Sequence, residues 1–281
     1  MWIDAHNHLQ SPRFAASSHE LLAVMQASGV SACVANGTHP TDWENVAALA
    51  AEHPDSVFPA FGVHPWQAGE LPVDWLEKLR HHLASHPMAG IGEIGLDLWV
   101  DEPPLHIQLP VFRSQWELAV ELNRPLTIHC LRAWSELLDE MDRLPPHPGR
   151  ILIHAFGGPP DTAERLLENG CVFSFNGAFL ARRKRRLFDW WRLSPKECLL
   201  VESDAPDMLP PQTYRHPFPN DSALPDTPPN HPASLAACAT AFATARGLTA
   251  AELAAITNAN FHRWWLGTCD ANSQHIHHST P

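Results

Sequence analysis

Histidine and carboxylate residues recur along this chain, each at the end of a short apolar run of the kind that forms a β-strand. The six positions are His6, His8, Glu93, His129, His154 and Asp204. Imidazole and carboxylate groups are the ligands that hydrolytic metal ions take in proteins. Barrels of alternating strands and helices carry their chemistry at the carboxyl ends of their strands. The placement of the six residues therefore predicts a metal-dependent hydrolase built on a parallel β/α barrel.

His6 and His8 are two residues apart, and such positions on a strand face the same side. Two neutral imidazoles that project together from a strand end make half of a transition-metal site. Taken alone, the pair also fits a surface turn in which Asn7 makes the hydrogen bonds and the histidines are incidental.

Glu93 is a lone carboxylate within the apolar segment Gly90-Ile-Gly-Glu-Ile-Gly-Leu-Asp97. A carboxylate in such surroundings must be paired or bound to a cation, and its two oxygens allow it to bridge two metal ions. A structural ion pair with an arginine is the alternative. The three glycines allow a backbone or a ligand to approach closely, and Asp97 is interpreted as a loop-organising or supporting acid.

His129, His154 and Asp204 end later strand-like runs. A single histidine at such a point is more often a hydrogen-bonded core residue than a ligand, but two on successive strands, after the earlier pair, favour a metal site. In a closed barrel the eighth strand lies beside the first. Asp204 is therefore predicted to contact a metal ion and to accept a proton from the attacking water. Glu202 lies two residues earlier, so its side chain faces the same side of the strand, and it is interpreted as a supporting or structural acid.

Two other features each leave two interpretations open. His64, in Gly62-Val-His-Pro-Trp66, either contacts the substrate or is a loop histidine held by its neighbours. Arg182-Arg-Lys-Arg-Arg186 is the only dense basic run in the chain. Such a run is usually a solvated helix face, and the alternative is that one or two of its side chains contact a phosphate at the barrel mouth.

Strand-like runs alternate with longer amphipathic ones, which predicts parallel strands joined by right-handed crossovers. The predicted strands are Trp2–Ala5, Ser31–Ala35, Val57–Gly62, Ala89–Ile94, Leu126–His129, Ile151–His154, Val172–Phe175 and Leu199–Glu202. The helices expected between them are His19–Ser28, Thr41–His53, Val73–Ser85, Leu105–Leu122, Ser135–Arg143 and Pro160–Glu168. Eight units in about 250 residues predict an α/β fold, a single-domain TIM-like (β/α)8 barrel. An open doubly wound sheet is the alternative, although no Gly-x-Gly-x-x-Gly follows the first strand.

The domain is assigned to residues 1–268, and a polar tail at 269–281 is expected to be flexible. The stretch Pro206–Pro232 is too long for an ordinary connection and is expected to be functional. Two closing helices are predicted at Ala233–Arg246 and Ala250–Trp265, the second with a capping box formed by Thr249 and Glu252.

Composition narrows the class of protein. The net charge of −12 argues against broad, non-specific adhesion to nucleic acid or anionic membranes, without excluding a nucleic-acid substrate. The 6 cysteines form no Cys-x-x-Cys pair and are predicted to be buried free thiols in a reducing compartment. There is no signal-peptide pattern and no apolar run of membrane-spanning length. A cytoplasmic location is expected, with no membrane and no obligate protein partner.

These residues and the segments around them resemble the TatD-like branch of the metal-dependent amidohydrolase superfamily, from residue 1 to about 266. The motifs that carry the resemblance are Ile3–Leu9, Gly62–Pro65, Ile91–Asp97, Gln108–Glu121, Thr127–His129, His154–Gly158, Glu202–Pro206 and Asn260–Trp265. The resemblance implies a TIM-like barrel with a two-metal phosphodiesterase site that acts on DNA, often from a 3′ end. A bridging hydroxide would attack phosphorus in line.

By this resemblance, the ligands of one metal ion would be His6, His8, Glu93 and Asp204, and those of the second Glu93, His129 and His154. Glu93 and Asp204 would be catalytic, and His64 and Arg132 would contact the substrate. The mixed ligands suit Zn²⁺, Mn²⁺, Co²⁺ or Fe²⁺, and the more oxygen-rich half also suits Mg²⁺.

The chain departs from the family pattern at three places around the substrate. Arg132 follows the fifth-strand histidine by three residues rather than two, Pro229-Asn-His-Pro232 lacks the usual arginine, and Leu98-Trp99 replaces the usual aromatic pair. Hydrolysis of DNA is the first hypothesis. The second is hydrolysis of a small amide, ester or lactone by the same metal centre, and the third is a catalytically silent barrel that serves as a binding protein.

Overall fold

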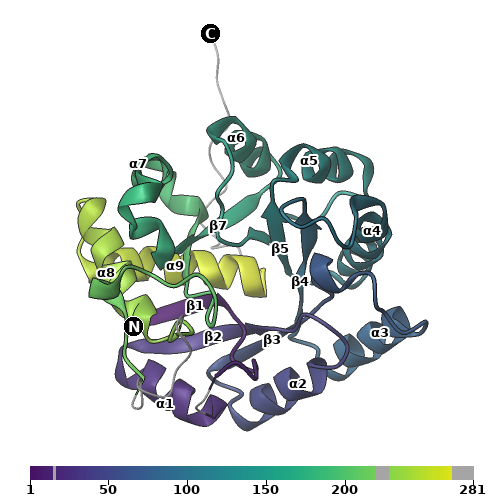
Figure 1. Ribbon diagram of the computed structural model, residues 1–281, viewed down its shortest axis with the longest axis horizontal. Helices are drawn as coiled ribbons and strands as arrows, with labels where there is room; N and C mark the ends of the chain where they lie inside the picture. Colours follow the sequence, from purple (N-terminus) through teal and green to yellow (C-terminus); the bar gives the residue numbers. More distant parts are fainter. Residues whose placement is uncertain (15–16, 219–227, 268–281) are drawn as a thin grey trace.

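Eight parallel strands follow one another around a barrel in the computed structural model, which describes residues 1–14, 17–218 and 228–267 (Figure 1). The strands are β1 Trp2–Asn7, β2 Val30–Asn36, β3 Val57–Phe61, β4 Gly90–Asp97, β5 Leu126–Leu131, β6 Ile151–Ile153, β7 Cys171–Asn176 and β8 Leu199–Glu202. Each strand pairs in parallel with the next. The sheet order β1 to β8 confirms the predicted (β/α)8 barrel and excludes the open doubly wound sheet.

Backbone hydrogen bonds beyond the end of β8 close the barrel against β1. The Asp204 N–H donates to the carbonyl oxygen of His6 over 2.9 Å, and the His8 N–H donates to that of Ala205 over 2.8 Å. These bonds bring the last strand end beside the first, as the sequence predicted for Asp204.

Helices surround the barrel, apart from the last of them, which lies across one end (Figure 1). Their bounds are α1 Ser18–Ala27, α2 Trp43–Glu52, α3 Trp75–Ser85, α4 Leu105–Leu122, α5 Trp134–Arg143, α6 Pro160–Glu168, α7 Arg185–Leu193, α8 Ser234–Ala245 and α9 Ala250–Leu266. The capping box predicted at Thr249 and Glu252 is present at the start of α9. Helix α7 was not among the predicted helices. The predicted tail at 269–281 and residues 219–227 of the long loop lie outside the described residues.

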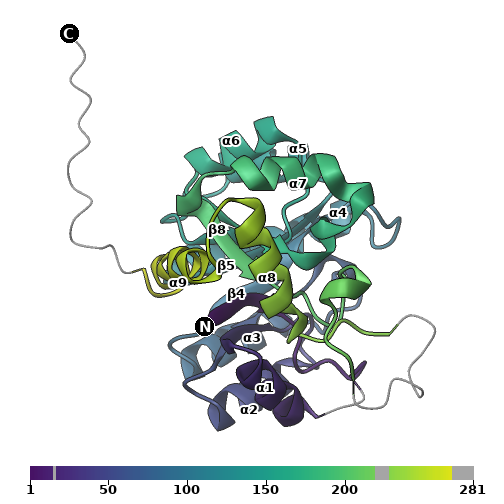
Figure 2. The same ribbon diagram turned by 90° about the vertical axis from the view of Figure 1, so that its left-hand side faces the viewer.

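Helix α9 lies across the end of the barrel at which the strands begin (Figure 2). Its Phe261, Trp264 and Trp265 are buried and pack on small and aliphatic side chains of the barrel interior. These interior residues are Ala5, Val34, Ala60, Leu152 and Leu200. The aromatic rings of α9 thus close the amino end of the barrel.

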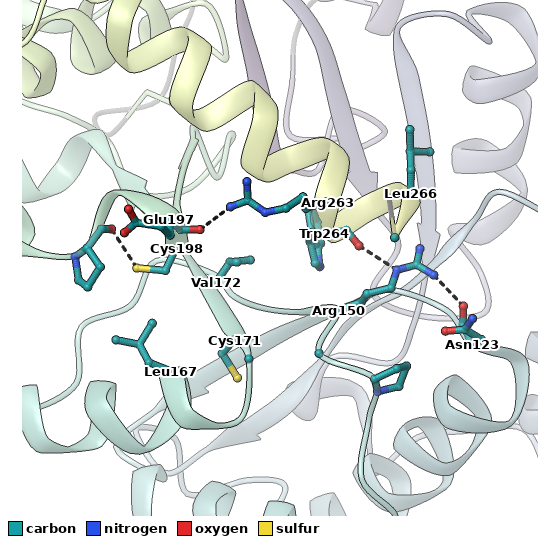
Figure 3. Close-up of a pocket in the computed structure, with 15 residues that line it drawn as sticks. Asn123, Arg150, Leu167, Cys171, Val172, Glu197, Cys198, Arg263, Trp264 and Leu266 are labelled. Atoms are coloured by element: carbon teal, nitrogen blue, oxygen red, sulfur yellow. Dashed lines mark hydrogen bonds between the residues drawn. The ribbon is translucent and has the colours of Figure 1, made fainter. Parts of the chain in front are cut away.

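A cavity of about 560 Å³ lies at this same end, next to α9 (Figure 3). The Arg150 guanidinium reaches across it and donates to the carbonyl oxygens of Asn123, Trp264 and Trp265. Arg263 likewise donates to the carbonyl oxygen of Glu197. Because these guanidiniums are occupied by backbone carbonyls, the cavity belongs to the attachment of α9 rather than to the predicted chemistry.

The buried cysteines agree with the sequence prediction over the described part of the chain. Free, buried thiols are present at Cys33, Cys130, Cys171, Cys198 and Cys238, while Cys269 lies outside the described residues. Among the helices of the described ranges, none combines the length and the hydropathy needed to cross a bilayer.

Candidate metal centre

The carboxylate of Glu93 lies at the centre of the site, and its two oxygens face different groups of side chains. Oε2 lies 3.4 Å from Nε2 of His6 and 3.2 Å from Nε2 of His8. Asp204 completes this group, since its Oδ1 lies 3.4 Å from His6 Nε2 and 3.7 Å from His8 Nε2. Because His6 is fully buried, the alternative of a surface turn is excluded.

The second group gathers around the other oxygen of Glu93. Nδ1 of His129 lies 3.2 Å and Nε2 of His154 lies 2.9 Å from Oε1. The same two ring nitrogens lie 3.2 Å from each other, and the rings of His6 and His154 stack with centroids 4.0 Å apart. The structure therefore brings all six predicted residues into one cluster, with Glu93 between its two halves.

Hydrogen bonds on the far side of two rings fix the nitrogen that faces the cluster. His8 Nδ1 lies 2.8 Å from the carbonyl oxygen of Asn36, which can only accept, so this nitrogen carries the proton. His129 Nε2 lies 2.9 Å from Oδ2 of Asp97 and likewise donates. In the neutral rings the remaining nitrogens, which face Glu93, carry lone pairs. Partners of this kind typically orient metal-binding histidines.

The remaining two rings have nitrogens that the described protein atoms leave unsatisfied. Neither ring nitrogen of His6 makes a hydrogen bond to any described residue, although both are buried. His154 Nδ1 lies 3.6 Å from Oε1 of the buried Glu202, which leaves its Nε2 facing Glu93. Atoms bound about 2.1 Å from one ion lie roughly 3.0 to 3.4 Å apart. The separations in each half of the cluster are close to that range, so the residues fit divalent metal ions.

The charge of the cluster also suits cations. Burial disfavours a charged His8, but hydrogen bonding to Glu93 and the charges of Glu93 and Asp204 outweigh burial and raise its pKa to about 9. Burial likewise opposes ionisation of Glu93, yet the surrounding imidazoles hold its pKa well below the ordinary value. No described arginine pairs with Glu93, which excludes the structural Glu–Arg alternative. Divalent ions would supply the positive charge that the imidazoles otherwise take up as protons.

Two glycines of β4 allow this packing. A Cβ on Gly92 would lie 2.7 Å from Cβ of Thr127, and one on Gly95 would lie 1.9 Å from the carbonyl oxygen of His129. Gly95 also has a φ of +151°, which disfavours other residues. Close approach of β4 to β5, predicted from the glycines, therefore places Glu93 beside His129.

The backbone at three strand ends lies in the left-handed region, where residues other than glycine are strained. Arg132, Ala155 and Asp204 have φ values of 60°, 42° and 53°. Arg132 directly follows β5, Ala155 directly follows His154, and Asp204 lies two residues beyond the end of β8. Strain of this kind clusters at functional sites, because the surrounding structure holds it in place.

His64 differs from the other histidines in the way that its ring is held. Its Nδ1 accepts a hydrogen bond from the Trp66 N–H over 3.2 Å, so in the neutral ring Nε2 carries the proton. Burial lowers the pKa of His64 to about 3, which keeps the ring neutral. Its Nε2 lies 3.5 Å from Oε1 of Glu93 and points its N–H into the site. In this tautomer His64 is a hydrogen-bond donor toward Glu93, and its ring also belongs, with Glu93 and His129, to a group whose ligand atoms could hold a metal ion.

Arg132 lies at the mouth of the barrel and stacks on Trp99. Its guanidinium carbon is 3.9 Å from the centroid of the Trp99 ring, and no described carboxylate pairs with it. Trp99 is 59% exposed and Trp66 is 51% exposed. The mouth therefore presents a cation and two aromatic surfaces to solvent. Trp99, one of the two residues that replace the usual aromatic pair of the family, thus contacts Arg132, the arginine that lies one residue later than in the family pattern.

Sequence reasoning missed Asp4, which ties the first strand to the eighth. Its carboxylate accepts from the Ser203 N–H over 2.9 Å, from the Ser203 hydroxyl over 2.6 Å and from the side-chain amide of Asn7 over 3.0 Å. Burial raises the pKa of Asp4 to about 6 against these bonds. Asp4 lies two residues before His6 within an apolar strand, and this position indicates a buried carboxylate near the site. Asp4 holds Asp204 and the histidine pair in register.

The sequence and the fold of this chain are similar to those of known proteins. A family model described as TatD related DNase matches residues 3–266. The 3′-5′ ssDNA/RNA exonuclease TatD of Erwinia tasmaniensis is 31% identical over 257 residues, which are 91% of this chain and 96% of that protein. The uncharacterized metal-dependent hydrolase YabD of Bacillus subtilis is 26% identical, over 94% of this chain and 98% of its own. The solved structure of YjjV, a TatD homologue from Escherichia coli, superposes with a TM-score of 0.83 at 27% identity, over 94% of this chain and 97% of that one.

Proposed function

The chain belongs to the TatD-related DNase family, and from this premise we propose that it is a metal-dependent phosphodiesterase that removes nucleotides from the 3′ end of single-stranded nucleic acid. The observation that carries the proposal is Glu93, whose two oxygens face two separate pairs of imidazole nitrogens. Two ligand sets that share one carboxylate suit a pair of divalent ions. Such pairs are common in enzymes that displace groups at phosphorus.

We propose that His6, His8, Glu93 and Asp204 hold one divalent ion and that Glu93, His129 and His154 hold the other. Zn²⁺, Mn²⁺, Co²⁺, Fe²⁺ and Mg²⁺ all suit such a mixture of nitrogen and oxygen ligands. Ions bound there would polarise the phosphoryl oxygens and lower the pKa of water. Asp97 and Glu202 orient the rings of His129 and His154 from behind.

Asp204 is the residue that accepts the proton of the attacking water. Its carboxylate stands at the open end of the barrel, next to His6 and His8, on a strained backbone that holds it in place. A base must lie within hydrogen-bonding reach of the proton that it removes. Asp204 meets this requirement for a water molecule that lies between Glu93 and the surrounding histidines.

Substrate contacts come from the mouth of the barrel. The N–H of His64 donates to a non-bridging phosphate oxygen, because the neutral ring offers a donor there. Arg132 pairs with a phosphate, and the exposed rings of Trp66 and Trp99 offer faces on which bases stack. The arginine that is displaced in the sequence therefore still serves an anionic substrate.

We assign residues 1–268 to one catalytic domain and propose that the enzyme works in the cytoplasm without an obligate protein partner. Free buried thiols are typical of proteins in a reducing compartment.

The test of this function compares substrates. Purified protein loaded with Mn²⁺ or Mg²⁺ is incubated with 5′-labelled single-stranded DNA and RNA, with the same DNA blocked at its 3′ end, and with a panel of amides, esters and lactones. We expect stepwise shortening from the 3′ end, abolished by the block, by chelation and by Asp204→Asn. Turnover of a lactone or amide with no cleavage of nucleic acid would overturn the proposal in favour of the small-molecule alternative.

A further inference from the structure

Four arginines near the barrel mouth have no partner within the described protein. They are Arg182, Arg183, Arg185 and Arg186, here called the basic run, and all four are exposed. Every other arginine of the chain contacts a carboxylate, a carbonyl oxygen or an aromatic ring, as shown by the hydrogen bonds, ion pairs and ring contacts. Among the described residues, the basic run therefore stands out by the absence of such a contact. Lys184, between them, packs on the ring of Phe179.

The fold places the basic run on the carboxyl side of the barrel, the side that holds the metal centre. It follows β7 through the short helix η2 (Gly177–Leu180) and leads into α7, which lies in the outer ring between α6 and α8 (Figure 1). A Cβ on Gly157 would lie 3.9 Å from Cδ2 of Leu187, the residue that follows the run. Gly157 is three residues beyond the ligand-type His154. The basic run therefore flanks the loop that leaves the cluster, on the carboxyl side of the barrel.

The basic run is energetically unfavourable in the isolated protein. Arg185 and Arg186 lie in the first turn of α7, which contains no acidic residue. Positive charge at a helix N-terminus opposes the helix dipole. The neighbouring guanidiniums also repel one another, and the nearby Asp189 pairs with Arg192 instead. A polyanion bound across the four side chains would relieve both effects.

We propose that the basic run binds the phosphate backbone of the single-stranded substrate, several nucleotides away from the bond that is cleaved. This inference rests on the proposed function and extends it to a second contact surface on the same substrate. Guanidinium groups pair with phosphates through two parallel hydrogen bonds. The chain as a whole has a net charge of −12 and repels a polyanion. The basic run therefore concentrates the attraction for the substrate beside the mouth.

The test replaces the four arginines with glutamine in one variant, R182Q/R183Q/R185Q/R186Q. A matched control, R80Q/R143Q/R165Q/R192Q, removes the same charge from exposed arginines that pair with carboxylates. Binding of fluorescent single-stranded DNA of about 15 and about 4 nucleotides is measured by anisotropy in EDTA over a range of salt. For the first variant we expect about tenfold or more loss of affinity for the longer DNA. Its salt slope should fall by roughly 0.7 for each lost contact.

Three further readouts separate this surface from the metal centre. Hydrolysis of bis-p-nitrophenyl phosphate should be unchanged in both four-arginine variants, and binding of the shorter DNA should change by less than about twofold. The thermal midpoint of the first variant should equal or exceed that of the wild type, because unfavourable charges are removed. Equal effects of the two variants, or equal effects on both DNA lengths, would overturn the inference. If the wild type binds the longer DNA through the basic run yet cleaves no phosphodiester, the surface stands and the proposed function fails.

Discussion

At the amino end of the barrel, α9 buries Phe261, Trp264 and Trp265 against aliphatic side chains, whereas at the carboxyl end the barrel buries imidazoles and carboxylates against one another. A Cβ on Gly90 would lie 2.8 Å from the ring of Trp265, so the backbone of β4 packs closely against that ring. The polar end instead holds strained backbone at Arg132, Ala155 and Asp204.

This difference separates stability from chemistry within one short barrel. Burial of large aromatic side chains stabilises a fold. Buried carboxylates destabilise it unless hydrogen bonds or cations compensate their charge. The amino end can therefore support a carboxyl end whose arrangement suits metal binding rather than stability. Substitutions at the carboxyl end should lower activity more than stability, whereas substitutions at the amino end should lower stability more than activity.

The largest effect is expected at the polar end. Glu93→Ala removes the carboxylate that faces both ligand sets, so phosphodiester cleavage should fall by about three orders of magnitude or more. Metal content measured by elemental analysis should fall with it. The thermal midpoint in EDTA should change less than in the aromatic-end variant described next. Retention of both bound metal and activity would show that Glu93 is not the shared ligand.

The aromatic end should show the reverse. Trp265→Ala leaves a cavity where the ring fills the barrel, and such truncations destabilise proteins by about 3 to 5 kcal/mol. Calorimetry should show a thermal midpoint lower by about 10 °C, since 1 kcal/mol corresponds to roughly 2 to 4 °C in a chain of this size. Turnover of the remaining folded protein should be unchanged within about twofold.

Trp265→Phe is the control for this variant, because it keeps most of the ring volume and removes a buried indole N–H that has no partner among the described residues. Its destabilisation should be much smaller. Loss of turnover in Trp265→Ala at a temperature where the protein is fully folded would mean that the two ends are coupled.

The smallest effect is expected when the pH is lowered and a histidine at the amino end takes up a proton. Burial lowers the pKa of His147 from 6.5 to about 4 in the folded protein, so the unfolded chain binds a proton first. Its contribution to stability is therefore present above pH 6.5 and is lost as the pH falls toward 4. His147→Gln should reduce the fall in thermal midpoint between pH 7 and about pH 4.5 by a few degrees. An identical pH dependence in both proteins would contradict this role.

The sequence predicted the barrel because its strands are apolar and each ends in a marked change of residue type. Boundaries moved where strand pairing continues past the apolar run: β4 reaches Asp97 rather than Ile94, since its last three residues pair with His129–Leu131 of β5. Helix α7 was missed because it begins with Arg185 and Arg186 directly after other basic residues, and its apolar residues, such as Leu187 and Trp191, come only after them.

The cluster of six ligand-type residues was predictable because barrel geometry brings strand ends together. The supporting role of Asp97 and Glu202 was predicted as well, but their partners were not, because these depend on side-chain directions. Trp66 donates through its indole nitrogen to Asp97 over 2.8 Å, and Asp97 in turn orients His129. Nothing in the spacing of these three residues indicates that they meet. The partner of Arg132 was equally hidden, since stacking on Trp99 depends on the paths of two loops.

Helix α9 has a consequence for the order of events during synthesis. A ribosome makes β1 first and α9 last among the described elements, so the interior face of the early strands has no aromatic cover until residues 261 to 265 emerge. The eight strands can pair before then, but the apolar side chains at their amino end remain exposed to water. Domains of this kind expose apolar surface while incomplete. Nearly the whole barrel must therefore emerge before its apolar amino end is covered.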